Sequence, residues 1–319
     1  QESEKKHLES DWEWDLRLFV SADIIGSTSY KAKARREHSP AWAQVFAEFF
    51  ADFPAFVEAS YRSLPDRCLD CCTRLSPWKF SGDEILFSVS LQDHREALSH
   101  LWVFKDAVSK YPHLWREKSR PLGLKPTGWI AGFPVTNRKV RISPDASDGL
   151  DFIGPSIDLG FRLTNYCSER MFVISAGLAL MVLDAIHTCE LDDEFFHIYF
   201  EGRKSLKGVI DGKPYPIVWI YMNDCASEKE EKLLGVARPH EPSTLGVYLR
   251  DFIEETPQLL RPFITKDADP KYSSTPQDIE NLRLQMMAEE SYRAYLTTGE
   301  NDEPPTGGDE HTPPDPSVD

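Results

Sequence analysis

The amino-acid sequence predicts an α+β fold, and three observations support that prediction. Strand-like and helical stretches follow one another in the order β-α-β-β-α-β, with a further helix and terminal strands behind them. This order lacks the regular strand–helix repeat of a doubly wound sheet. Two of the strand-like stretches meet at a Gly-Asp-Glu sequence, as in a β-hairpin. Together these features indicate a ferredoxin-like sandwich with helices on one face of the sheet.

The first half of the unit is a strand, a helix and a hairpin. Residues 16–24 alternate apolar and polar side chains, which predicts a strand. The residues from Trp42 to about Leu64 carry apolar side chains at helical spacing. Pro54 lies inside this stretch, so we expect a kink or a break there. The segment Pro77–Val89 predicts two strands joined at the Gly-Asp-Glu turn.

The remaining elements follow the hairpin. Residues 137–150 are charged and irregular, which is typical of a loop or of a pair of short strands. The other predicted elements are a helix at 94–115, a strand at 125–135, a helix at 155–169, a strand at 171–174, a helix at 176–186, and strands at 197–200 and 216–221.

The chain divides into four predicted parts. A polar lead-in covers residues 1–15, the α+β domain covers 16–224, and a helical acidic extension covers 225–300. Residues 301–319 are rich in Pro, Gly and acidic side chains and should be disordered. Within the extension we expect helices at 228–234, 244–255 and 275–296.

Composition and charge argue against several classes of protein. The formal net charge is −16, which disfavours a nucleic-acid-binding surface. No apolar run approaches ~18 residues, so no membrane span is expected. The charged start lacks the apolar core of a signal peptide, and we expect a cytoplasmic protein. Cys68, Cys71 and Cys72 resemble half of a zinc site, but no matching pair follows, so reduced thiols are expected.

Two carboxylates occupy related positions in the predicted fold. Asp23 ends the first strand, and Asp83 lies at the hairpin tip. The first and third strands of such a unit are neighbours, so these carboxylates should converge and repel unless a cation lies between them. Two divalent ions there can clamp a triphosphate, with the backbone N–H groups and hydroxyls of residues 24–29 beside it. The alternative is that Asp23 caps a helix and Asp83 is a solvated turn residue.

Three segments in register resemble the class III nucleotidyl cyclases. They are FVSADIIGST at 19–28, KFSGDE at 79–84 and GPSIDLGFRL at 154–163, and the resemblance spans roughly residues 16–221. It implies an enzyme that converts a nucleoside triphosphate to its 3′,5′-cyclic monophosphate and pyrophosphate. It also implies a homodimer with active sites at the interface.

The resemblance implies roles for individual residues. Asp23 and Asp83, with the backbone carbonyl of Ile24, would hold two Mg²⁺ or Mn²⁺ ions. Lys79 and Asp151 fall at the two base-reading positions.

A second group of residues falls where the family binds phosphates and ribose. Arg162 matches the arginine that steadies the charge on the phosphates, and Lys207 matches the lysine that binds the triphosphate. Asp158 stands where the family usually has Asn, which orients the ribose. A carboxylate can still accept a hydrogen bond from a hydroxyl, but it adds negative charge beside the phosphates. One subunit would hold the metals while the other supplies Arg162, Lys207 and both base-reading residues.

The base-reading pair constrains the substrate only in part. Lys79 donates and Asp151 accepts, which excludes guanine better than it separates adenine, cytosine and uracil. Trp78, Phe80 and Phe152 flank the pair, and any that turn inward would shrink the pocket towards a pyrimidine. The alternative is that all three simply pack in the core.

The layout of the chain adds a hint about substrate. A lone cyclase-like domain with an acidic helical tail is similar to the pyrimidine cyclases of bacterial Pycsar anti-phage systems. Their product, cyclic UMP or cyclic CMP, is sensed by a separate effector protein. On this resemblance we rank a uridylate cyclase first, a cytidylate cyclase second and an adenylate cyclase third.

Two other interpretations stay open. A non-catalytic dimerisation or nucleotide-binding module with the same fold is supported only by Asp158. A diguanylate cyclase shares the Ser-Gly-Asp-Glu sequence, but the 154–162 segment and Lys207-Gly208 do not fit that family.

Overall fold

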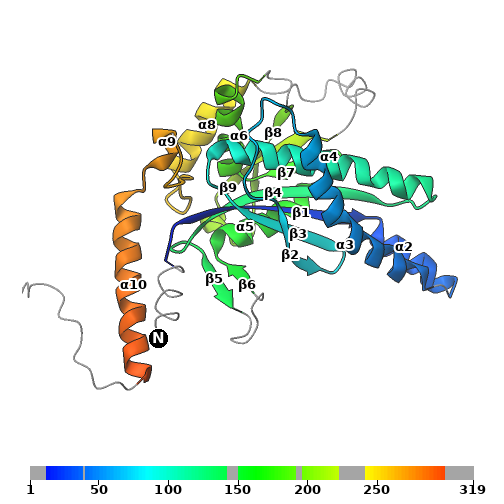
Figure 1. Cartoon of the computed structure of the whole chain (residues 1–319), viewed down its shortest axis with the longest axis horizontal. Helices are drawn as coiled ribbons and strands as arrows, with labels where there is room; N and C mark the ends of the chain where they lie inside the picture. The colour runs from blue at the N-terminus through cyan, green and yellow to red at the C-terminus, as the bar shows by residue number, and fades with distance from the viewer. Residues whose placement is uncertain (1–11, 39, 142–149, 192–195, 223–240, 299–319) are drawn as a thin grey trace, which may run out of the picture.

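The computed structural model describes residues 12–38, 40–141, 150–191, 196–222 and 241–298 (Figure 1). The strands are β1 (Asp15–Ile25), β2 (Ser76–Ser81), β3 (Glu84–Ser90), β4 (Gly123–Phe133), β5 (Arg138–Arg141), β6 (Leu150–Ile153), β7 (Met171–Ile174), β8 (Ile198–Ser205) and β9 (Pro214–Tyr221). The helices are α2 (Ser27–Arg36), α3 (Ala41–Ser60), α4 (His94–Glu117), α5 (Pro155–Leu163), α6 (Ala176–Thr188), α8 (Pro242–Glu254), α9 (Pro270–Ser273) and α10 (Gln277–Thr298).

One seven-stranded sheet organises the fold, in the order β2-β3-β1-β4-β7-β9-β8. Strand β1 pairs antiparallel with both β3 and β4, while β4 and β7 run parallel. The first four strands therefore have the ferredoxin-like arrangement, with the first and third strands side by side. The predicted α+β class is confirmed, and further strands extend the sheet beyond β4.

Strand β1 divides the core because successive side chains point to opposite faces of the sheet. Leu18, Val20 and Ala22 are fully buried in the larger core, which α3, α4 and α6 cover. Phe19 points the other way and packs with Trp129 in a smaller, largely aromatic core. Since Asp23 is an even number of residues from Phe19, it shares this second face.

Helix α3 is continuous from Ala41 to Ser60 despite Pro54, so the predicted break does not occur. Its buried aromatic side holds it against α4, where the rings of Phe53 and Tyr111 lie 5.3 Å apart. This tertiary packing offsets the local cost of proline in a helix.

Helix α5 corrects the prediction that the helices lie on one face. It packs against Trp129, and a Cβ atom added at Gly160 would lie 2.2 Å from that ring. Only glycine allows so close an approach. The helix ends at Leu163, earlier than predicted, and a short 3₁₀ turn follows. Residues 138–141 and 150–153 form the paired β5 and β6, so the short-strand alternative for this region holds.

The C-terminal extension shares the core of the sheet domain. The predicted helices near 244–255 and 275–296 are present as α8 and α10. Leu245, Leu249 and Phe252 of α8 are buried in the larger core beside α6, whereas α10 runs along the outside (Figure 1). The predicted helix at 228–234, the boundary near Asp224 and the tail from 301 lie outside the described residues. Among the described helices, none is long and apolar enough to cross a membrane.

Candidate active site

The pairing of β1 with β3 brings Asp23 and Asp83 to one edge of the sheet. Asp23 lies opposite Glu84 in the register, and Asp83 occupies the turn between β2 and β3. The backbone N–H of Ile24 donates to the carbonyl oxygen of Asp83 over 3.2 Å. Gly82 has φ 67°, a left-handed conformation that glycine supplies readily.

A cavity of about 680 Å³ opens beside these two carboxylates. Its lining also includes residues 24–29, where Gly26 leads into the first turn of α2 and hydroxyl-bearing residues occupy 27–29. Carboxylate and carbonyl oxygens are the ligands that Mg²⁺ and Mn²⁺ prefer. The donor set around Asp23, Ile24 and Asp83 therefore fits divalent metal ions.

Asp23 is a partly buried carboxylate with charged groups on both sides. Burial raises the pKa of Asp23, Lys125 lowers it in part, and the charge of Asp83 raises it again, so the pKa stays above its ordinary value. The Nζ atom of Lys125 lies 2.8 Å from Oδ2 of Asp23, and Nζ of Lys31 lies 3.9 Å from Oδ1 of Asp83. Each predicted metal-binding carboxylate thus has a lysine beside it.

No pattern in the sequence identifies Lys125 as a site residue, because it stands in an ordinary predicted strand. Only the register of β1 against β4 places it opposite Asp23. The hydrogen bond could not be anticipated without knowing that register.

Lys79 and Asp151 form an ion pair, with Nζ 2.8 Å from Oδ2. Lys79 belongs to β2 and Asp151 to β6, and their side chains are 43% and 25% exposed. The backbone N–H of Phe152 also donates to Asp151 Oδ1 over 2.9 Å. The two residues predicted to read the base are therefore adjacent in one chain and open to solvent.

The three aromatic residues flanking this pair have different positions. Trp78 and Phe152 pack edge-to-face on each other and on Phe19, with ring centroids 5.1–5.2 Å apart. Phe80 is 53% exposed, and its ring packs against Phe50 of α3. The core-packing alternative thus describes Trp78 and Phe152 but not Phe80.

The predicted phosphate-binding residues gather at α5 and the end of β8. Nε of Arg162 donates to the backbone carbonyl of Lys207 over 3.2 Å. Asp158 lies one turn earlier on the exposed side of α5. In the described part of the chain, no hydrogen bond or ion pair between side chains joins the metal-binding, base-reading and phosphate-binding groups to one another.

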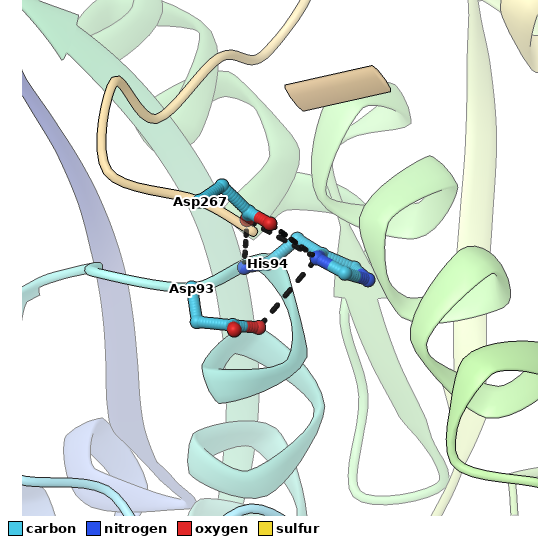
Figure 2. Close-up of side chains that lie close together, drawn as sticks. All are labelled: Asp93, His94 and Asp267. Atoms are coloured by element: carbon cyan, nitrogen blue, oxygen red, sulfur yellow. Dashed lines mark hydrogen bonds and ion pairs between the residues drawn. The ribbon is translucent and has the colours of Figure 1, made fainter. Parts of the chain in front are cut away.

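A second acidic cluster, Asp93, His94 and Asp267, was not anticipated from the sequence (Figure 2). Its potential ligand atoms lie within 4.8 Å of one another. Asp267 accepts hydrogen bonds from the backbone N–H of His94, at 2.6 Å, and from that of Asp269. Both oxygens of Asp93 bond Arg95, and Asp93 caps α4.

This cluster holds parts of the fold together and is not well suited to bind a metal ion. The carboxylate oxygens already accept several hydrogen bonds within the chain, which is what buried carboxylates require. The His94 ring stacks on Tyr272 at 4.7 Å, and Tyr272 donates to Asp184 of α6. The contacts join α4 and α6 to the C-terminal extension.

Comparisons with known proteins give likenesses of structure only. No family model matches the chain, and no protein with a curated description matches it by sequence. The adenylyl cyclase CyaB from P. aeruginosa is similar with a TM-score of 0.49 and 12% identity, over 67% of this chain and 97% of that chain. The guanylyl cyclase Cya2 is similar with a TM-score of 0.45 and 15% identity, over 67% and 95%. The guanylate cyclase domain of RhGC from Catenaria anguillulae, in complex with GTP, is similar with a TM-score of 0.45 and 10% identity, over 66% and 100%.

Proposed function

We propose that the protein is a metal-dependent nucleotidyl cyclase whose active sites form between two copies of the chain. The convergence of Asp23 and Asp83 beside an open cavity of about 680 Å³ carries the proposal. Two carboxylates at a sheet edge, next to the backbone N–H groups at the start of α2, suit a metal-bound triphosphate.

The reaction is an intramolecular displacement at phosphorus. The ribose 3′-hydroxyl gives up its proton to water and its oxygen bonds to the α-phosphorus, while the bond from that phosphorus to the bridging oxygen breaks and pyrophosphate leaves. Metal ions held by Asp23, Asp83 and the carbonyl of Ile24 would supply acidification of the hydroxyl and charge neutralisation. Arg162 and Lys207 would bind the leaving pyrophosphate. Asp158 would accept a hydrogen bond from a ribose hydroxyl.

In the described part of the chain no side-chain hydrogen bond or ion pair links the three groups, and this supports a site completed by a second copy. A second copy facing the first would bring its Lys79, Asp151, Arg162 and Lys207 towards the partner's metal carboxylates. Exposed apolar side chains accompany the base-reading pair, since Phe80 and Ile153 are 53% and 54% exposed. Such side chains are typical of a surface that another chain covers.

The substrate proposed first is UTP, followed by CTP and then ATP. Lys79 and Asp151 supply one donor and one acceptor, which can meet the Watson–Crick edge of uracil, cytosine or adenine. The preference for a pyrimidine rests on the resemblance to Pycsar cyclases. So does the proposed role in anti-phage defence, with a cytoplasmic cyclic nucleotide sensed by a separate effector protein.

The test is incubation with each of the four nucleoside triphosphates and Mn²⁺, followed by identification of the product by mass. Cyclic UMP is expected as the main product, and a product from ATP alone would overturn the substrate ranking. Asp83→Ala should abolish pyrophosphate release, whereas Asp70→Ala, at an exposed carboxylate paired with Arg74, should not. Equal turnover by both variants would refute the metal assignment, and no pyrophosphate release by the unmodified protein would favour a binding module.

A further inference from the structure

A second cavity lies at the opposite end of β1 from the proposed metal site. It has a volume of about 280 Å³ and lies where residues 259–266 of the C-terminal extension pass the start of β1 (Figure 1). Asp15 lines this cavity, whereas Asp23 lines the cavity beside the proposed metal ligands. At about 3.4 Å per residue, the strand between these two residues spans roughly 27 Å. The two cavities are therefore separate sites.

Part of the wall of this second cavity is apolar and comes from distant parts of the chain. The sheet contributes Leu16 and Ile130, helix α5 contributes Leu159, and the C-terminal extension contributes Ile253 and Phe263. Cavities that bind small organic molecules are lined mainly by such side chains, with a few polar groups that fix the orientation of the ligand. The apolar part of the wall therefore suits the hydrocarbon body of a small molecule.

The charged part of the lining has an excess of positive charge. Its basic residues are Lys139, Arg261 and Lys266, and its acidic residues are Glu13 and Asp15. Within the described residues, Lys266 has no ion pair, and Arg261 donates only to a backbone carbonyl. The polar part of the cavity therefore favours an anionic group over a cationic one.

The carboxylate of Asp15 does not leave a free negative charge in the cavity. Its Oδ2 atom lies 2.8 Å from Nζ of Lys139 and 3.2 Å from Nη1 of Arg17, and its Oδ1 atom accepts a hydrogen bond from Ser90. The contact with Asp15 uses one of the three N–H donors of Lys139, whose side chain is only 18% exposed. An anionic group in the cavity would supply an acceptor for the other two donors.

Two helices begin at the same cavity and add to the positive potential of the basic side chains. Ser156 in the first turn of α5 and Gly177 in the first turn of α6 both line it. The backbone N–H groups on either side of Gly177 donate to the hydroxyl groups of Tyr215 and Ser175. Among the described residues, the N–H of Gly177 itself has no acceptor. Free N–H groups at the start of a helix favour a bound anion.

We propose that this cavity binds a small carboxylic acid with an apolar body. The carboxylate accepts hydrogen bonds from Lys139 and from the N–H of Gly177, and the body lies between Leu159 of α5 and the C-terminal extension. Because the walls come from the sheet, from α5 and from the extension, a bound ligand joins the extension to the rest of the domain. The proposal concerns a site separate from the nucleotide site and does not rest on the proposed function.

The experiment is isothermal titration calorimetry of the full chain without nucleotide or metal, with octanoate and 3-phenylpropanoate as the two ligands. At least one of them should bind, and octylammonium, which carries the opposite charge on the same chain, should bind at least about tenfold more weakly. Lys139→Met should weaken carboxylate binding about tenfold, the order expected for a charge-assisted hydrogen bond. Lys139→Arg should restore most of the affinity, and Lys33→Met, on the exposed side of α2, is the matched control.

Filling the cavity provides a second test that changes no charge. Leu260 lines the cavity and is half-exposed, so Leu260→Trp should occupy the space and abolish binding. The better-binding carboxylate should raise the thermal midpoint of the wild type but not that of Leu260→Trp. If Lys139→Met has a lowered midpoint without ligand, Leu260→Trp decides the test alone.

Three results would overturn the proposal. They are no binding of either carboxylate to the wild type, equal affinity for octanoate and octylammonium, and undiminished carboxylate binding by Leu260→Trp or by a stably folded Lys139→Met. None of these measurements involves nucleotide turnover, so their failure is distinguishable from a failure of the proposed function.

Discussion

Lys79 and Asp151 are separated by 72 positions in the sequence, yet their side chains form a 2.8 Å ion pair. The pair joins the edge strand β2 to the small β5–β6 hairpin, above the aromatic side chains of Trp78 and Phe152. Both proposed base-reading residues therefore belong to the same subunit. Asp83, at the tip of the same hairpin as Lys79, would serve the other active site of the dimer.

This arrangement predicts complementation between two inactive variants. Lys79→Ala should impair base binding at one site, and Asp83→Ala should impair metal binding at the other. Mixing the two purified proteins should restore up to about a quarter of the wild-type pyrophosphate release, because half of the dimers are mixed and each has one intact site. A mixture no more active than either variant would contradict the shared-site dimer.

The contact between Gly160 and Trp129 predicts a sharp steric effect. Gly160→Ala would place its methyl group 2.2 Å from the indole ring, so α5 must shift. We expect a loss of about 2–3 kcal/mol in the free energy of unfolding, measured by urea denaturation.

Two variants test the origin of that loss. Gly132→Ala, whose added Cβ would lie 3.9 Å from Leu16, should cost much less. The double variant Trp129→Leu/Gly160→Ala should lose less free energy of unfolding than the two single variants lose together. Strict additivity would show that the ring contact is not the cause.

The cluster around Asp267 predicts a large effect on stability. The side chain of Asp267 is fully buried and accepts hydrogen bonds from the backbone N–H groups of His94 and Asp269. Asp267→Ala leaves those donors unsatisfied and should lower the free energy of unfolding by about 3 kcal/mol. The C-terminal extension should also become sensitive to limited proteolysis.

The control for this prediction is Asp251→Ala, at an exposed position on α8. Similar unfolding of both variants would rule out a structural role for the cluster. The thermal midpoint should be unchanged by EDTA, and a fall on adding chelator would identify the cluster as a structural metal centre instead.

Glu84 predicts a pH-dependent contribution to stability. Burial raises the pKa of Glu84, the charge of Asp23 raises it further, and the ammonium of Lys125 lowers it in part. Because the folded-state pKa lies above the unfolded value, the folded state binds the proton more tightly. Stability from this group is present at low pH and is lost as pH rises through the raised pKa.

Glu84→Gln should therefore stabilise the metal-free protein at pH 7, by on the order of 1 kcal/mol, and have little effect at pH 4. Urea unfolding at the two pH values provides the measurement. Glu58→Gln, at an exposed site on α3, serves as the control. A stabilisation of equal size at both pH values would show that burial of the charge is not responsible.

Much of the fold and part of the site could be predicted because the signals are local. The alternation of residues 16–24 and the Gly-Asp-Glu turn are sufficient to place Asp23 at the end of one strand and Asp83 in the turn that leads into its neighbour. The resemblance similarly identified Lys79 and Asp151, which the structure brings together. Lys125 and the Asp93–His94–Asp267 cluster depend on register and on contacts between distant segments, and neither leaves a pattern in the sequence.

Errors in the prediction have the same origin. Of the kink or break expected at Pro54, the break does not occur, because aromatic packing against α4 keeps α3 continuous. The prediction placed helix α5 on the same face of the sheet as the other helices. The helix packs instead against Trp129 on the opposite face, because Gly160 has no side chain to prevent the contact. In both cases tertiary contacts outweigh what the local sequence favours.

The burial of α8 against α6 limits how far the chain can be shortened. A protein ending at Met222 would retain every residue assigned to catalysis but uncover the apolar surface that Leu245, Leu249 and Phe252 now fill. Such truncations would aggregate before their activity could be measured. The shortest useful version of this protein is therefore set by its hydrophobic core, and it is longer than the segment that carries its motifs.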